Sequence, residues 1–65
     1  MQVELNGKPF ETDAATLADL IDAEGFEAPS VATAVDGIFI PRATRSSVSL
    51  TEGLRIEVLS PMQGG

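Results

Sequence analysis

The 65-residue sequence contains no cysteine, no histidine and neither tryptophan nor tyrosine. Without cysteine the chain can form neither a disulfide framework nor a zinc knuckle, and nothing indicates an oxidising compartment. Cysteine and histidine also supply many nucleophiles and general bases, so side-chain catalysis is poorly supported here. We therefore do not expect an enzyme.

Motifs for cofactors and metals are missing as well. Neither a Walker pattern nor GxGxxG occurs, so no phosphate cradle is expected. Carboxylate pairs such as Asp19 with Asp22 lack calcium-loop spacing and are better explained by a solvated helix face. We expect neither a metal nor a bound cofactor.

Positive charge is scarce, with four basic residues against ten acidic ones and a net charge of −6. This balance repels nucleic-acid phosphates and anionic lipid headgroups and favours a partner with a basic surface. No apolar run approaches the roughly 20 residues of a membrane span, and no basic segment typical of a signal peptide opens the chain. The sequence predicts a cytoplasmic protein that binds neither nucleic acid nor membrane.

Two dipeptides, Asn6-Gly7 and Asp36-Gly37, are typical of type I′ hairpin turns. The strand that returns from the first turn contains Pro9, which cannot donate to a ladder, so we expect that strand at a sheet edge. The strand that returns from the second turn is the run Ile38-Phe39-Ile40. Because the side-chain period of a strand is two, Phe39 points outward if both isoleucines point inward, as we expect.

One amphipathic helix is predicted between the hairpins. Apolar residues recur at helical spacing over residues 17–24. Thr16 with Asp19 resembles a capping box at the start of the helix, and Gly25 suits the left-handed position after its end.

A polar loop and a last strand complete the chain. Val48 and Leu50 are the expected core anchors of the loop, and residues 54–59 alternate like a half-buried strand. One helix must then cover the apolar face of one sheet, which predicts a two-layer α+β domain over residues 1–59. Residues 60–65 are expected to form a flexible tail.

The tail reads SPMQGG and ends on Gly64 and Gly65. Two residues without a Cβ make the thinnest tail that could enter a partner's channel, and six extended residues reach roughly 20 Å. The terminal carboxylate is a poor electrophile that acyl chemistry must first activate, usually with ATP. A frayed end without function is the alternative interpretation.

Four segments together, LNGKPF, VATAVDGIFIPR, SLTEGLRIEVL and the final GG, resemble the thiamine-biosynthesis sulfur carrier proteins. The resemblance spans nearly the whole chain and implies a ubiquitin-like β-grasp fold, a mixed sheet of four to five strands with one helix packed across it. The first and last strands would be parallel at the centre of the sheet. Thr33 and Leu54 depart from the family's usual residues, which are apolar and Asp, respectively.

The resemblance also implies a cycle of sulfur transfer. A ubiquitin-activating-like adenylyltransferase uses ATP to adenylate Gly65, which then becomes a thiocarboxylate. The sulfur comes from a donor such as a cysteine desulfurase and passes to thiazole synthase. Gly64 keeps the approach to the partner's site thin.

Phe39, Leu59 and Met62 are our candidates for a partner interface, because a contiguous patch of outward apolar residues would mark one. The competing interpretation is that Leu59 and Met62 extend the core. Arg42 and Arg45 could form surface ion pairs, either with acids of a partner or with the chain's own excess of acids. Such pairs are worth about 0–1 kcal/mol, so neither arginine is ranked as a site residue.

Two other functions remain open from the sequence. The carrier could deliver sulfur to molybdopterin or to another acceptor. A ubiquitin-like module that binds partners without covalent chemistry would also fit the fold, and such a module should tolerate deletion of the tail.

Overall fold

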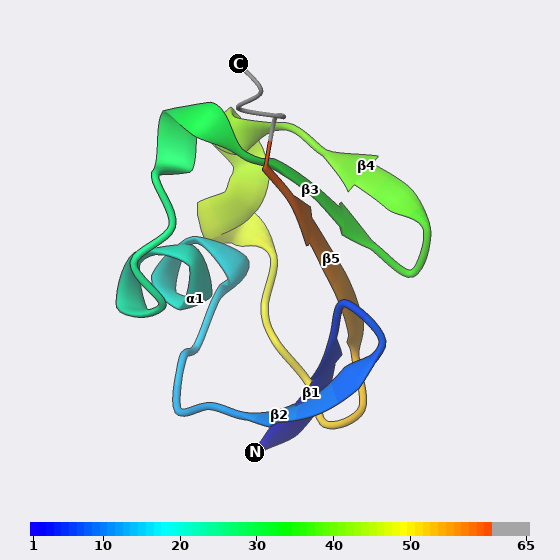
Figure 1. The fold of residues 1–65 in the computed structure, drawn as a ribbon. Coiled ribbons are helices and arrows are strands. Elements are labelled where there is room, and N and C mark those ends of the chain that lie inside the picture. The colour runs from blue at the N-terminus through cyan, green and yellow to red at the C-terminus, as the bar shows by residue number, and fades with distance from the viewer. Residues whose placement is uncertain (61–65) are drawn as a thin grey trace.

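Two hairpins build the two halves of a single sheet (Figure 1). The structure, a computed structural model, describes residues 1–60. In the first hairpin β1 (Gln2–Leu5) pairs with β2 (Lys8–Glu11), and in the second β3 (Ala32–Val35) pairs with β4 (Ile38–Ile40), both antiparallel. The φ angles are 51° and 84° in the Asn-Gly turn and 51° and 82° in the Asp-Gly turn, and a type I′ turn requires such positive values. Both predicted turns are confirmed.

β5 (Arg55–Leu59) joins the two halves and gives the strand order β2-β1-β5-β3-β4. It runs parallel to β1 and antiparallel to β3, so the first and last strands are parallel neighbours at the centre of the sheet. β2, which contains Pro9, is an edge strand as predicted, and β4 forms the other edge. The mixed sheet of five strands confirms the predicted fold class.

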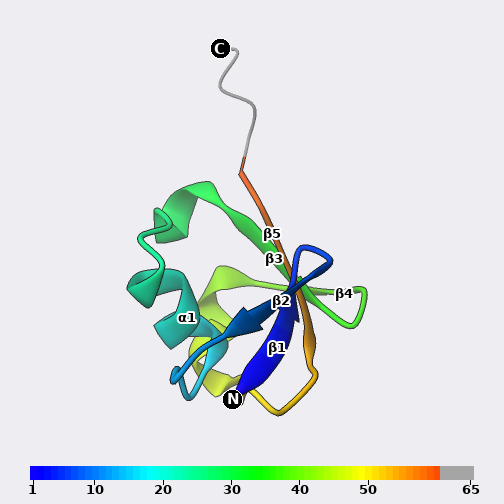
Figure 2. The ribbon, with the colours of Figure 1, turned by 60° about the horizontal axis from the view of Figure 1, so that its bottom comes forward.

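The helix α1 (Leu17–Ala23) lies on one side of the sheet (Figure 2). The hydroxyl of Thr16 accepts a hydrogen bond from the backbone amide of Asp19 at 3.2 Å, and Gly25 has a φ of 76°. Both predicted ends of the helix are therefore confirmed to within one residue. Its apolar stripe packs with inward side chains of β1 and β5 and with the predicted loop anchor Leu50. The buried core consists of Val3, Leu17, Leu20, Ile21, Leu50, Ile56 and Val58.

Two short 3₁₀ helices occupy segments that the sequence predicted as connections, η1 (Ala28–Ser30) and η2 (Arg42–Ser47). In η2 the backbone amide of Thr44 donates to the carbonyl oxygen of Pro41 at 3.0 Å. Such tight turns are held by local hydrogen bonds between residues three apart. They are too short to produce an apolar periodicity, so the sequence pattern did not predict them.

The prediction that Ile38 points into the core is wrong. Its register opposite Val35 places it on the helix side of the sheet, yet 66% of its surface is exposed. β4 is the edge strand farther from α1, so the helix does not extend over it (Figures 1 and 2). Ile40 is half-buried, and Phe39 is exposed as predicted.

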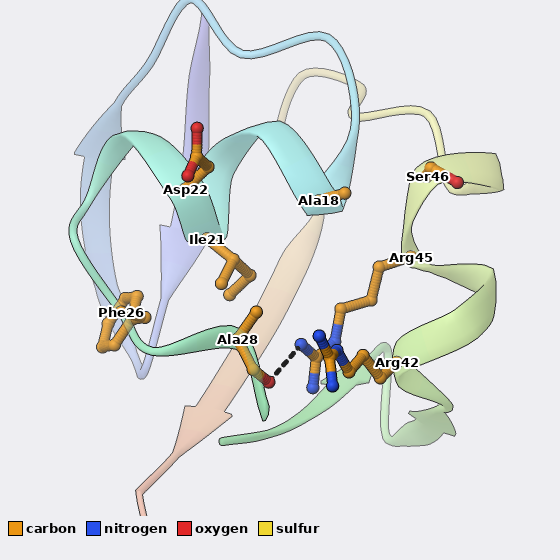
Figure 3. A pocket seen from close by; sticks show the side chains of 8 residues that line it. All are labelled: Ala18, Ile21, Asp22, Phe26, Ala28, Arg42, Arg45 and Ser46. Atoms are coloured by element: carbon orange, nitrogen blue, oxygen red, sulfur yellow. Dashed lines mark hydrogen bonds between the residues drawn. The ribbon is translucent and has the colours of Figure 1, made fainter. Parts of the chain in front are cut away.

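Arg45 is buried, with 3% of its surface exposed, so the prediction that it forms a surface ion pair is wrong. Its Nε donates to the Thr33 hydroxyl at 3.0 Å, and one terminal nitrogen donates to the carbonyl oxygen of Val31 at 2.7 Å. The other terminal nitrogen donates to the carbonyl oxygen of Ala28 at 2.9 Å (Figure 3). The Thr33 hydroxyl in turn donates to the carbonyl oxygen of Ile40 at 2.9 Å. One side chain therefore links η2 to η1, to β3 and, through Thr33, to β4.

We predict that Arg45→Met lowers the free energy of unfolding by about 2–4 kcal/mol, because the buried Thr33 hydroxyl and two part-buried carbonyl oxygens lose their charged donor. Chemical denaturation followed by circular dichroism would measure the loss. Arg42→Met is the matched control, since it removes the same charge from an exposed position, and its expected effect is below about 0.5 kcal/mol. Equal losses from the two variants would show that charge, and not hydrogen bonding, is the cause.

Candidate functional site

The outer face of the sheet, opposite α1, carries a row of apolar side chains. Phe39 of β4 lies opposite Ala34 of β3, and Leu59 of β5 lies opposite Ala32 of β3. Because alternate residues of a strand share a face, all four side chains are on the same side of the sheet. Phe39 and Leu59 are 64% and 66% exposed. These four residues, which we call the outer-face patch, place two small side chains between two large ones.

Charged residues border the outer-face patch. Glu57 of β5 lies opposite Ala34, and Arg55, on the same face of β5, lies opposite Glu4 of β1. Opposite charges facing each other across neighbouring strands attract. The outer face therefore has an apolar part beside a charged part, as small protein interfaces often do.

Leu59 also borders the end of the described chain. An open hollow of about 340 Å³ lies there, lined by Pro29, Ser30, Val31, Ala32, Leu59 and Ser60. Ser60, the last described residue, therefore lies at this hollow and next to Leu59 of the outer-face patch. The other predicted site residues, Met62, Gly64 and Gly65, lie outside the described residues.

Asn6 fixes the strand that leads to this end of the molecule. Its backbone amide donates to the carbonyl oxygen of Ile56 at 2.9 Å. Its side-chain Nδ2 donates to the carbonyl oxygen of Val58 at 3.2 Å, and its Oδ1 accepts from the Val58 amide at 2.8 Å. β1 ends at Leu5, and the side chain of Asn6 then continues the hydrogen bonding to β5 as far as Val58, where the backbone of the turn no longer runs beside β5. The sequence identified Asn6 only as a turn residue, because this role depends on the register of β1 against β5.

A second hollow, of about 300 Å³, lies between α1 and η2 (Figure 3). Ile21 and Phe26 contribute apolar walls, and the guanidinium groups of Arg42 and Arg45 lie close together on another side. Burial and then the positive charge of Arg42 lower the pKa of Arg45, although a guanidinium remains protonated at neutral pH. Because Arg45 directs its hydrogen bonds to the protein's own backbone and to Thr33, we interpret this arrangement as structural. In the sequence, only Thr33 could have indicated the buried Arg45, because a hydroxyl at a core position of a strand needs a hydrogen-bond partner.

Within residues 1–60, no group of three or more acidic side chains is placed to hold a metal ion. No helix in the same range has the length and apolar character needed to cross a bilayer. The outer-face patch is our candidate functional surface because it gathers two of the most exposed large apolar side chains on one face of the sheet.

Comparisons with known proteins agree with the geometry. The model of the ThiS family matches residues 3–65. The chain is similar to the crystal structure of the thiamine biosynthesis protein ThiS from Geobacter metallireducens, with 28% identity, a TM-score of 0.82 and coverage of 100% of both chains. It is similar also to a solution NMR structure of a thiamine biosynthesis protein from the same organism, with 28% identity and a TM-score of 0.83, covering 100% of this chain and 88% of that one. No curated protein gives a significant match. The structural likeness confirms the predicted ubiquitin-like β-grasp fold.

We predict that Asn6→Gly lowers the free energy of unfolding by about 1–2 kcal/mol through loss of the two side-chain hydrogen bonds to Val58. Glycine keeps the positive φ of the turn, so backbone strain does not contribute. Asp36→Gly is the matched control, because Asp36 has the same φ but its side chain makes no hydrogen bond to β5 among residues 1–60. Urea denaturation measures both variants, and similar losses would contradict the anchoring role of Asn6.

Proposed function

We propose that the chain, which belongs to the ThiS family, is a sulfur carrier of thiamine biosynthesis and acts as a protein co-substrate rather than as an enzyme. The observation that carries this proposal is the family match, which extends over residues 3–65 and so includes both terminal glycines. Partner enzymes would perform the chemistry on a chain that itself has neither cysteine nor histidine.

The reacting group in this proposal is the carboxylate of Gly65. A ubiquitin-activating-like adenylyltransferase binds ATP, the carboxylate attacks the α-phosphate, and pyrophosphate leaves. A hydrosulfide equivalent, derived from a cysteine desulfurase and a thiol reductant, then attacks the acyl carbon and expels AMP. The resulting thiocarboxylate delivers its sulfur to thiazole synthase. ATP is a substrate of the partner, and the chain needs no cofactor of its own.

In this proposal the domain, residues 1–59, binds the partner, and the tail, residues 60–65, carries the reacting carboxylate. Extended, the six tail residues reach roughly 20 Å, which allows Gly65 to enter a deep site while the domain stays outside. Gly64 keeps the approach to the reacting carbonyl free of side chains. The two bonds between Asn6 and Val58 support this arrangement, since they hold the strand from which the tail departs.

The outer-face patch is the proposed docking surface for the adenylyltransferase. Phe39 and Leu59 would be its two large anchors, and Met62 would extend it along the tail. Exposed aromatic and aliphatic side chains on a strand surface can fill pockets on a partner and often carry much of the binding energy. The net charge of −6 favours a basic surface around those pockets.

A terminal thiocarboxylate can be detected by its reactivity. We expect the protein, isolated from cells with its adenylating partner and alkylated while unfolded, to gain one adduct that fragmentation maps to Gly65. Because the chain lacks cysteine, no other thiol competes. Alkylation also separates sulfur incorporation from methionine oxidation, which a bare mass gain would not do.

The variant without Gly65 is the control for this experiment, and it should keep its circular dichroism spectrum and gain no adduct. Absence of an adduct on the intact chain, with an active partner, ATP and a sulfur donor supplied, would refute the proposal. Function that survives deletion of Gly65 would favour the non-covalent ubiquitin-like module. The observation that favours this second function is the outer-face patch, because an exposed apolar surface can bind a partner without covalent chemistry.

Docking through the outer-face patch predicts a specific pattern of variants. Phe39→Ala and Leu59→Ser should each lower the rate of adenylation at limiting carrier by about 10-fold, in line with the 1–2 kcal/mol typical of interface anchors. Ile38→Ser is the matched control, since Ile38 is as exposed as Leu59 but lies on the opposite face of the sheet. Unchanged rates for the two patch variants, with folding intact, would exclude this docking surface.

The identity of the sulfur acceptor is a separate part of the proposal. Thiazole synthase is the acceptor implied by the family, and a molybdopterin-type acceptor is the alternative. Supplying each purified acceptor with the thiocarboxylate form and following loss of the alkylatable sulfur would distinguish them.

A further inference from the structure

The two edges of the sheet differ in how they are protected against pairing with another chain. β2 carries Lys8, Pro9 and Glu11, and charged residues and proline are common guards of an edge strand. β4 consists only of the apolar residues 38–40. It has neither a charge nor a proline within the strand, and its Ile38 and Phe39 side chains are both exposed.

The first hairpin shows how a proline closes an edge. Pro9 is the second residue after its turn and lies opposite Glu4. The backbone amide of Glu4 donates to Leu54 at 2.9 Å, in the direction of β5 and away from β2. Because the two residues of such a pair direct their backbone groups away from each other, the nitrogen of Pro9 faces the free edge. No donor is therefore available there.

The second hairpin has the same geometry and an open edge. The backbone amide of Asp36 donates to Arg55 of β5 at 2.9 Å. Directions alternate along a strand, so Ala34 also turns its backbone groups towards β5. Its partner Phe39 is the second residue after the turn, the position that Pro9 occupies in the first hairpin. The N–H and C=O of Phe39 therefore face outward from the free edge of β4.

We propose that this edge pairs antiparallel with β4 of a second copy of the chain, with Phe39 on the twofold axis. The run Ile38-Phe39-Ile40 reads the same in both directions, so Phe39 meets Phe39 of the second copy, and Ile38 meets Ile40. The flanking charges match as well, because the same register brings Asp36 towards Arg42 of the second copy. The edge is thus self-complementary in backbone groups, side chains and charge.

Self-pairing at this edge is expected to be weak because the contact area is small. Phe39 offers one donor and one acceptor, so the twofold contact contains two main-chain hydrogen bonds, together with apolar contacts on both faces. Such a contact is smaller than the 1,200–2,000 Å² of a standard interface, and a dissociation constant on the order of 10⁻⁴ M is expected. The two Phe39 side chains cover each other in the pair, so self-pairing competes with any ligand of the outer-face patch.

Sedimentation equilibrium of the full chain tests the proposal. The average mass should rise from one chain towards two between about 10 μM and 1 mM. Over the same range, hydrogen exchange at the Phe39 amide should slow, because this amide faces solvent in the monomer. A constant mass of one chain at the highest concentration would overturn the proposal.

Two variants test the edge itself. Ile38→Lys introduces the usual guard of an edge strand and should weaken self-association at least 10-fold. Leu59→Lys is its matched control, because it makes the same change at an equally exposed residue away from β4, and it should leave self-association unchanged. Equal weakening by both would mean general apolar association and would overturn the proposed register.

Phe39→Pro removes the outward donor in the way that Pro9 does in β2, and it should abolish self-association while circular dichroism shows the native fold. Should this variant fail to fold, Ile38→Lys still decides the outcome. Ile38 lies outside the outer-face patch, so a loss of self-association in Ile38→Lys is independent of docking to the adenylyltransferase. The inference and the proposed function can therefore fail separately.

Discussion

The hydrogen bonds of the buried Arg45 guanidinium are the interaction on which the half of the structure that contains η1, β3 and β4 depends. The apolar core belongs to α1, β1, β5 and the loop at Leu50, whereas the only fully buried residue of β3 is the polar Thr33. Arg45 compensates by donating to three oxygen atoms, none of them a carboxylate. Charged donors form stronger hydrogen bonds than neutral ones, which offsets the cost of removing the charge from water. Through Thr33 the same interaction reaches the backbone of β4.

Much of the fold could be predicted from the sequence, because its signals were local. The two Gly-containing turns, the edge strand marked by Pro9, the helix with its caps and the alternation of β5 all depend on residues close together in the chain. The strand order was different, since pattern alone did not determine it, and the family resemblance supplied only the parallel first and last strands at the centre of the sheet. Ile38 was mispredicted because alternation defines the face of a residue but not whether another element covers that face.

The candidate site was predictable to a similar extent. Alternation predicted Phe39 and Leu59 on the outer face, but it left open that Leu59 extends the core, and the 66% exposure of Leu59 excludes that alternative. The contributions of Asn6 and Arg45 were not predictable, because each acts across a pairing of distant segments. A polar side chain in a short sequence is easily assigned to solvent, and only the three-dimensional register shows that its partners are backbone groups.

The central strand of the sheet is also the last strand of the described chain. The bond between Asn6 and Val58 joins residues 52 positions apart, and contacts over such separations incur loop-closure entropy before they stabilise the fold. Neither hairpin can bury its inner face without Ile56 and Val58, which complete the core. During synthesis, we therefore expect the domain to fold only after β5 has emerged from the ribosome. A product of interrupted translation that stops before β5 would lack two strands' pairing partner and two core residues, so it would not present the outer-face patch in its folded arrangement.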